Sequence, residues 1–273
     1  MATCPVQGAR IYYEAHGSGP VLLMLSGGSG DADGFGPLVP YLSKRFTVVT
    51  YDRRGYARSP LDGAGQAAFV TIETQSDDAQ RVASAVSAEP AYVFGSSLGA
   101  VIGLDMAARY AERVRVLVAH EPPLLALLTA EQRVAATPTV REGESVMEAL
   151  QRFTRQLGIS AEGMAPAVDP QRLDAQKREM LERRMVNATF FLQHEVAGVE
   201  HYLPDFDRLK ASSAQIVIAG GEAGRAYSPY VMAQRAAKLL GTPLVEFPGH
   251  HVGYFQYPQA FAQQLTAAYD LRR

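Results

Sequence analysis

The chain has 273 residues, of which 47% are hydrophobic and 20% are charged, with a formal net charge of −2 at pH 7. This balance excludes intrinsic disorder and gives no general attraction for nucleic acid or anionic lipid, so neither is expected as a partner. The one cysteine, Cys4, excludes an internal disulfide and a thiolate-rich zinc site, and the lack of a signal peptide or a long apolar run predicts a cytoplasmic protein without membrane contact.

The first 123 residues alternate short β-rich runs with helical patterns. The run at 21–25 is apolar throughout, which is typical of a strand buried on both faces, and Cys4 lies before the first predicted strand. Buried strands that alternate with helices predict a parallel sheet covered by helices on both sides. The predicted strands are 11–13, 21–25, 46–51, 91–94 and 114–119, and the predicted helices are 71–86 and one that ends at Tyr110.

The alternation stops at residues 124–205, where helical stretches follow one another and no strand is indicated. Residues 145–157 place apolar side chains at helical spacing, and residues 174–194 form a longer helical stretch that we expect to be interrupted near Asn187. The pattern therefore predicts a helical segment inserted into the sheet protein.

Strand and helix patterns alternate again in the last third of the chain. The simplest account is one α/β core, formed by residues 1–123 and 206–273, with an inserted helical cap at 124–205. No internal repeat or flexible linker is visible. The predicted strands here are 215–219 and 244–247, and the predicted helices are 231–240 and 258–271.

One short motif points to chemistry. Residues 95–99 read Gly-Ser-Ser-Leu-Gly, the single G-x-S-x-G match in the chain. The match directly follows a predicted buried strand and precedes a helix, as a nucleophile elbow requires, so we expect the Ser97 hydroxyl to project at the carboxyl end of the sheet. The alternative is a glycine-rich turn with an incidental serine.

A serine hydroxyl needs a base within hydrogen-bonding reach to act as a nucleophile. Of the six histidines, His250 and His251 follow the last predicted strand. Their loop leaves the same sheet edge as Ser97, because parallel strands end together. The position alone does not choose between the two adjacent rings.

With these features, the chain resembles the α/β-hydrolase superfamily over essentially its full length. The matching segments are the strand and Ser-Gly-Gly loop at 23–28, the Tyr-Asp-Arg-Arg-Gly segment at 51–55 followed by Ser59, the serine motif and the late Gly-His loop. In such enzymes the catalytic histidine precedes a proline by a short aromatic-containing stretch. That register relative to Pro258 implies His251 as the base, with His250 as a loop or pocket residue.

The resemblance also implies an oxyanion hole of two backbone N–H groups. Leu98 follows the nucleophile, and Gly28 occupies the donor position in the loop after the early strand. Ser26 replaces the usual histidine of that loop, which leaves the donor intact because it belongs to the backbone. These glycines do not indicate a nucleotide site, because no Gly-Lys-Ser/Thr follows them.

The acid that orients the histidine departs from the usual pattern. Most relatives place an aspartate after the strand that here is 216–218, where this chain has only Glu222. A glutamate can instead follow the strand after the nucleophile helix, as in one subgroup of haloalkane dehalogenases and in the zearalenone-type lactone hydrolases, which this chain resembles more closely. We favour Glu121 at that position and keep Glu222 as the alternative. Glu121 would otherwise be a structural anchor of the cap.

An apolar cap suggests the kind of substrate. The cap is expected to roof the pocket, although apolar side chains at such positions are more often part of a cap core than substrate contacts. The prediction is a small, uncharged, hydrophobic substrate with no cofactor and no metal, and the sequence indicates no oligomeric state. We assign Ser29, Phe153, Met185, Phe190 and His250 to substrate binding, and Met180 and Phe191 would make the roof of the pocket more apolar.

These assignments predict a serine hydrolase that cleaves an ester or lactone through an acyl-enzyme. Epoxide hydrolases and dehalogenases need an aspartate nucleophile, which the motif lacks. A C–C bond hydrolase, an amidase or peptidase using the same residues, and a non-catalytic ligand-binding member of the fold stay open as alternatives. An amine-binding peptidase would need acidic residues in the cap.

Overall fold

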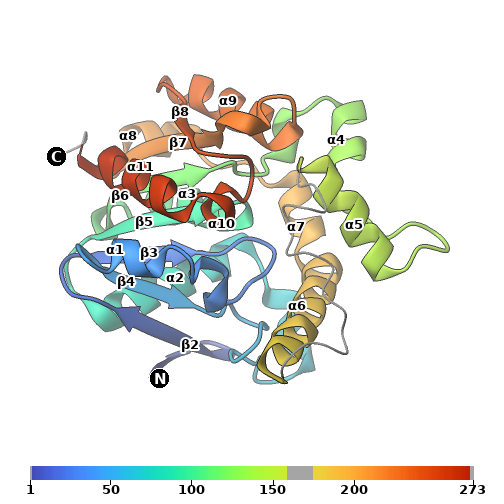
Figure 1. Cartoon of the computed structure of the whole chain (residues 1–273), viewed down its shortest axis with the longest axis horizontal. Coiled ribbons are helices and arrows are strands. Elements are labelled where there is room, and N and C mark those ends of the chain that lie inside the picture. The colour runs from blue at the N-terminus through green and yellow to red at the C-terminus, as the bar shows by residue number, and fades with distance from the viewer. Residues whose placement is uncertain (1, 159–174, 271–273) are drawn as a thin grey trace.

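A computed structural model describes residues 2–158 and 175–270 of the chain. Its sheet has eight strands, β1 (Ala2–Val6), β2 (Ala9–His16), β3 (Val21–Leu25), β4 (Thr47–Tyr51), β5 (Ala91–Ser96), β6 (Val114–His120), β7 (Gln215–Gly221) and β8 (Val245–Phe247). They lie in the order β1-β2-β4-β3-β5-β6-β7-β8 (Figure 1). Strand β2 pairs antiparallel with β1 and β4, and every other pair is parallel. This is the mostly parallel α/β sheet that the sequence predicts.

Helices cover both faces of this sheet because its central strands bury alternate side chains on opposite sides. In β3, Leu23 and Leu25 belong to one buried apolar cluster, and Leu22 and Met24 belong to another. The first cluster includes residues of α2 (Ile72–Val86), α3 (Leu98–Arg109), α8 (Phe206–Ala211) and α9 (Ser228–Leu240). The second includes residues of α1 (Val39–Leu42), α10 (Gly253–Gln256) and α11 (Pro258–Asp270).

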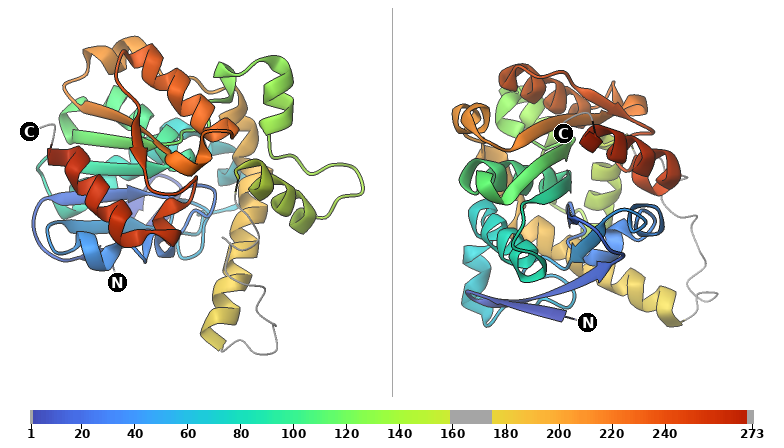
Figure 2. Two further views of the ribbon diagram at one scale, coloured as in Figure 1. Left: turned by 45° about the horizontal axis from the view of Figure 1, so that its top comes forward. Right: turned by 90° about the vertical axis from the view of Figure 1, so that its left-hand side faces the viewer.

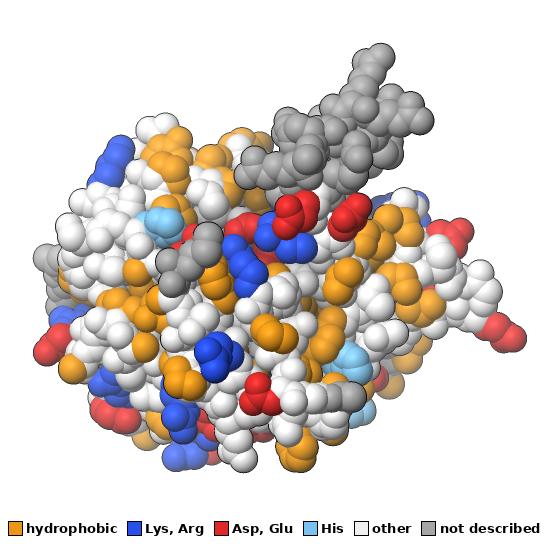
Figure 3. Space-filling view, turned by 90° about the horizontal axis from the view of Figure 1, so that it is seen from below, with side chains coloured by type: hydrophobic (Ala, Val, Ile, Leu, Met, Phe, Trp, Pro, Cys, Tyr) orange, Lys and Arg blue, Asp and Glu red, His pale blue; other side chains and the backbone are white. Residues whose placement is uncertain are grey.

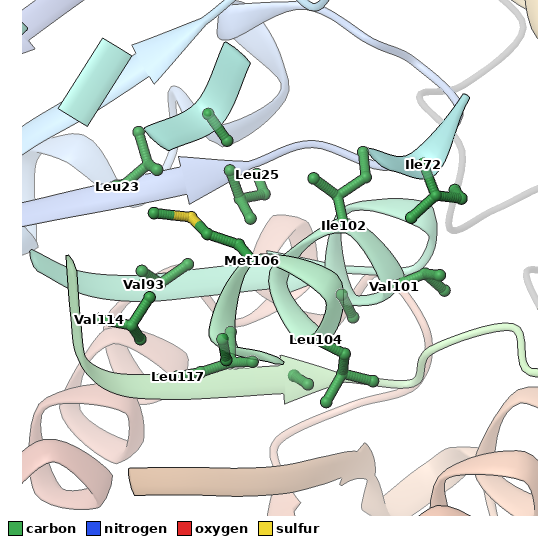
Figure 4. Packing of buried hydrophobic residues seen from close by; sticks show 14 of the residues in the cluster. Leu23, Leu25, Ile72, Val93, Val101, Ile102, Leu104, Met106, Val114 and Leu117 are labelled. Carbon is green, nitrogen blue, oxygen red and sulfur yellow. The ribbon is translucent and has the colours of Figure 1, made fainter. Parts of the chain in front are cut away.

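Helix α3 is the best-buried helix, and it fixes the position of the residue before it, Ser97. Its side chains pack between β3, β5 and β6, with Met106 pointing toward the strands in Figure 4. A Cβ at Gly103 would lie 2.7 Å from a methyl group of Leu117, so a glycine permits this close helix–sheet contact. The start of α3 is therefore held rigidly against the sheet.

Between β6 and β7 the chain forms a separate group of helices. In Figures 1 and 2 these helices stand together along one side of the sheet, outside its two covering layers. Residues 159–174 of the predicted cap lie outside the described residues, and the division into core and cap stays a prediction. The elements are η4 (Leu125–Leu127), α4 (Ala130–Ala136), α5 (Val146–Gln156), α6 (Ala175–His194) and α7 (Val196–His201).

Two expectations about local structure were wrong. Strand β1 was not predicted, and Cys4 lies buried within it rather than before the first strand. This strand contains Pro5, which is tolerated because β1 is at the sheet edge. Helix α6 also continues through Asn187, whose side-chain amide donates to the Ser29 carbonyl at 2.8 Å instead of competing for its own backbone.

The surface shows no separation of charge on the face drawn in Figure 3. Basic and acidic side chains lie beside one another there, with apolar side chains scattered between them. The small net charge is thus not the sum of two large opposite patches on this face. Among the helices of the described residues, none has the length and apolar character needed to cross a membrane.

Candidate active site

Ser97 occupies a sharp turn between β5 and α3. Its φ of 55° and ψ of −126° lie in a region that costs a non-glycine residue about 1–3 kcal/mol. Both motif glycines are needed here, because a Cβ at Gly95 would lie 2.4 Å from the Gly99 carbonyl oxygen and one at Gly99 would lie 1.9 Å from that of Leu25. The motif therefore forms the strained strand–turn–helix that the sequence predicts.

His251 and Glu121 form a buried hydrogen-bonded pair. The distance from Nδ1 of His251 to Oε2 of Glu121 is 2.6 Å, and the two residues are only 4% and 1% exposed. With Nδ1–H donating to the carboxylate, Nε2 of the ring presents its lone pair as a hydrogen-bond acceptor. The pair thus selects the ring tautomer that a general base requires.

The Glu121 residue is held by contacts with β7 and with His251 in the loop after β8. Burial raises its pKa, but the hydrogen bonds from His251 and from the backbone N–H of Gly221, the latter at 2.9 Å, lower the pKa below its ordinary value on balance. Glu121 has a φ of 48°, and its own N–H donates to the Ala219 carbonyl at 2.9 Å. These contacts keep the carboxylate ionised and aimed at the imidazole.

The alternative acid, Glu222, lies elsewhere. It begins the short turn η6 (Glu222–Gly224) after β7 and is exposed to solvent. Within the described chain, the carboxylate that contacts His251 is that of Glu121.

The predicted oxyanion loop lies against Ser97. A Cβ at Gly27 would be 3.0 Å from that of Ser97, and one at Gly28 would be 3.3 Å from the ring of Phe191. Leu98 is the first residue of α3, so its N–H has no acceptor one turn earlier in the helix. The structure therefore places Gly28 between the serine turn and the helix α6 that covers it.

A cavity of about 40 Å³ opens beside Ser97 and His251. Of the predicted site residues, Ser97, Leu98, Phe153 and His251 line it. No Asp, Glu, Lys or Arg is among its described lining residues, so its wall is apolar apart from the His251 ring and two hydroxyls. The remaining lining residues are Pro123, Leu125, Ala136, Pro138, Leu157, Phe191, Val196, Val199, Ser228, Pro229 and Met232.

Four predicted substrate contacts are not among the described residues that line this cavity: Ser29, Met185, Phe190 and His250. Phe190 packs edge-on against Tyr56, with the ring centroids 4.9 Å apart, so it anchors α6 to the core. His250 accepts a hydrogen bond from the Val252 N–H through Nδ1, and the Ser29 carbonyl receives the Asn187 amide. The Met180 side chain is outside the described part of the chain.

Two features of the site were missed from the sequence. His120 precedes Glu121 on β6 and is fully buried among Phe94, Phe247 and Phe261, with neither ring nitrogen hydrogen-bonded within the described chain. Burial lowers its pKa to about 4, so the ring is neutral at pH 7. The second feature is the wall that α7 and the start of α9 contribute; only the spacing of Val196 and Val199 hinted at it.

The tertiary structure gives no sign of a metal centre in the described residues, where no three His, Cys, Asp or Glu side chains come together. Asp52, which directly follows β4, is buried and pairs with Arg58 at 2.6 Å, so its carboxylate has a structural partner. The structure brings Ser97 and His251 to one cavity, with Glu121 hydrogen-bonded to His251.

Comparison with known proteins places this geometry in a family. The family model for the alpha/beta hydrolase fold matches residues 20–194. The uncharacterized hydrolase YraK of Bacillus subtilis is 41% identical over 268 residues, which are 96% of this chain and 93% of YraK.

Two solved structures share the fold at low sequence identity. Est816, described as an N-acyl homoserine lactone degrading enzyme, has a TM-score of 0.70 and 19% identity, covering 97% of this chain and 99% of its own. The enol-lactonase from Burkholderia xenovorans LB400 has a TM-score of 0.62 and 19% identity, covering 99% of this chain and 100% of its own. From the family match and the similarity to YraK, this chain belongs to the α/β-hydrolase fold family.

Proposed function

We propose that the protein is a serine hydrolase in which Ser97 is the nucleophile, His251 is the general base and then acid, and Glu121 is the acid that orients it. The observation on which this rests is the 2.6 Å hydrogen bond between His251 and Glu121, beside the strained Ser97 turn and at the same cavity. A buried carboxylate bound to Nδ1 stabilises the imidazolium that forms when Nε2 accepts a proton.

The proposed reaction has two halves. His251 removes the Ser97 proton as Oγ attacks the substrate carbonyl, and the N–H groups of Gly28 and Leu98 stabilise the oxyanion. The imidazolium then protonates the leaving alkoxide, which leaves an acyl-enzyme. Water attacks this ester with its proton passing to His251, and the collapse of the second intermediate returns that proton to Ser97 and releases the carboxylic acid.

The cavity supports a small, uncharged, apolar acyl group. Its described lining offers no Asp, Glu, Lys or Arg side chain, so a charged acyl group would lose hydration without gaining an oppositely charged partner. An amine-binding peptidase is disfavoured for the same reason, because no carboxylate lines the cavity among the described residues. An ester or lactone fits, and two structures of the same fold are named for action on lactones.

The proposal includes residues 124–205 as the cap that roofs this cavity. Phe153 of α5, Phe191 of α6 and Val196 of α7 contribute to the lining from this segment. The acid placement is the feature behind the similarity to zearalenone-type lactone hydrolases, which stays a prediction.

A fluorophosphonate probe tests the nucleophile. We expect covalent labelling of the purified protein at Ser97, located by peptide mass spectrometry, and no labelling of Ser97→Ala. An unlabelled wild-type protein would refute the proposal. A panel of p-nitrophenyl esters of increasing acyl length and a set of lactones then tests the substrate class, with the shortest neutral acyl groups turned over best.

A further inference from the structure

The predicted oxyanion loop is held in place by one residue, Arg53. The loop after β3 makes a turn in which the Gly30 N–H donates to the Gly27 carbonyl at 3.0 Å. Arg53 contacts both ends of this turn: its backbone N–H donates to the Gly30 carbonyl at 2.7 Å, and its Nη2 donates to the Gly27 carbonyl at 2.8 Å. The Gly28 N–H belongs to the same planar peptide group as the Gly27 carbonyl, so the contact from Arg53 also restricts where this N–H points.

The same guanidinium is bound to the cap. Arg53 Nη1 donates to Oε1 of Glu195, and its Nη2 lies 3.0 Å from Oε2 of the same carboxylate. The Tyr56 hydroxyl also donates to Glu195, and Gln75 accepts from Arg53. Both members of the ion pair have side chains only 1% exposed.

Glu195 lies at the junction between helices α6 and α7, next to the substrate cavity. The next residue, Val196, lines the cavity, as does Val199, whose N–H donates to the Glu195 carbonyl at 3.1 Å. Glu195 itself is not among the described lining residues. One carboxylate thus joins the cavity wall, through one guanidinium, to the turn that contains Gly28.

The chemistry of this contact favours a fixed geometry. An arginine presents donors in a rigid planar fork, so it can bind a carboxylate and a carbonyl at the same time in one orientation. Removing either charge leaves the other buried and uncompensated, which displaces it toward whatever polar group or water it can reach. For Arg53, that displacement withdraws a donor from the Gly27 carbonyl.

We propose that Arg53 and Glu195 are positioning residues that hold the oxyanion loop in a fixed orientation relative to helices α6 and α7. This inference rests on the proposed hydrolase function. They do not touch substrate. They determine the direction of the Gly28 N–H relative to the part of the cavity wall that α7 forms. Their loss should therefore reduce the rate of reaction at Ser97 and change substrate affinity little.

The neighbouring residue supplies a matched control. Arg54 forms a second buried pair with Asp78 of α2, at 2.6 Å and 2.7 Å, with both side chains 2% exposed. Its remaining contact in the described chain is with the Gln7 carbonyl, away from the oxyanion loop. Asp78→Asn therefore perturbs an equally buried pair of the same chemistry without touching the Gly27–Gly30 turn.

The experiment compares Glu195→Gln with Asp78→Asn in the full-length protein. For Glu195→Gln we expect kcat for p-nitrophenyl butyrate and the fluorophosphonate labelling rate of Ser97 to fall about 10-fold or more, since loss of a whole oxyanion donor costs about 10²–10³. KM should stay within about twofold. Asp78→Asn should keep both rates within about twofold of wild type, even if its thermal midpoint falls as far as that of Glu195→Gln.

Arg53→Lys provides a second test if Glu195→Gln does not fold. It keeps the charge beside Glu195 but loses the fork that also reaches Gly27, so the same fall in rate is expected. Wild-type rates in a folded Glu195→Gln or Arg53→Lys protein would overturn the positioning role. Labelling of Ser97 in the same proteins would still support the proposed hydrolase function. Equal losses in Asp78→Asn would also overturn it, and an unlabelled wild-type protein would instead refute the proposed function.

Discussion

The loops that follow β6 and β7 leave the same edge of the sheet, and each contains a glutamate, yet the two glutamates end in different surroundings. Glu121 is 1% exposed and bound to His251, whereas Glu222 is exposed to solvent. The loop after β7 supports Glu121 instead: the Gly221 N–H donates to its carboxylate. The loop after β6 therefore carries the glutamate that contacts His251, and the end of β7 supplies a backbone donor to the same carboxylate.

The side chains near the ends of the two strands also differ. His120 on β6 and Ala219 on β7 are register partners, and only His120 adds a titratable ring under the site. Gly224, in the turn after β7, completes the arrangement, because a Cβ there would lie 3.2 Å from Oε1 of Glu121. The small residues after β7 thus make room for the larger ones after β6.

The difference between the two glutamates is tested most directly by replacing each of them alone. We expect Glu121→Gln to lower kcat by about 10³–10⁴-fold, because an amide neither stabilises the imidazolium nor enforces the tautomer. Glu222→Gln should leave kcat within about twofold. Steady-state kinetics on a p-nitrophenyl ester measure both. A larger loss for Glu222→Gln would reverse the assignment of the acid.

The second prediction concerns the pH dependence of stability. As the pH falls through 6.5, an unfolded His120 gains a proton, whereas the folded ring stays neutral down to about 4 because burial lowers its pKa. The unfolded state then binds more protons, so His120 removes about 3 kcal/mol of stability between pH 6.5 and 4. In His120→Leu the free energy of unfolding should decline less over this range.

Urea unfolding at pH 7 and at pH 4.5 measures this difference, with His201→Leu as the control. His201 is exposed at the end of α7, so its replacement should leave the pH dependence as in wild type. If His120→Leu loses as much stability as wild type between the two pH values, the ring is not held neutral by burial.

A smaller effect is expected from Gly224→Ala. The added methyl group would crowd the Glu121 carboxylate at 3.2 Å, and a displacement of a few tenths of an ångström weakens its bond to His251. We expect kcat to fall about 10-fold, by analogy with the sensitivity of catalysis to misplacement. Gly63→Ala is the control, since a Cβ there meets nothing within 4 Å. Equal kcat in the two variants would show that the turn after β7 tolerates a side chain.

Much of this molecule could be predicted from periodicity and turn chemistry. The five apolar residues of β3 and the Gly-x-Ser-x-Gly turn were identified at their observed positions. Both features depend on residues that are adjacent in the sequence, since a fully buried strand is apolar throughout and the sharp turn requires glycines. The edge strand β1 was missed, since its side chains alternate less clearly and Pro5 argued against a strand. The uninterrupted α6 was missed because the partners of Asn187 lie 156 and 158 residues away along the chain.

The sequence by itself determined the fold class and the residue types of the site, since a strand–Gly-x-Ser-x-Gly–helix pattern and a late His loop fix which edge of the sheet holds them. Only the tertiary structure shows which of the two glutamates contacts His251, because 130 residues separate Glu121 from His251 and no local pattern measures that distance. It also decided that Arg53, rather than Arg54, meets the oxyanion loop. The side chains of these two adjacent arginines reach different partners, Glu195 and Asp78, and which of them meets the loop is known only once the chain is folded.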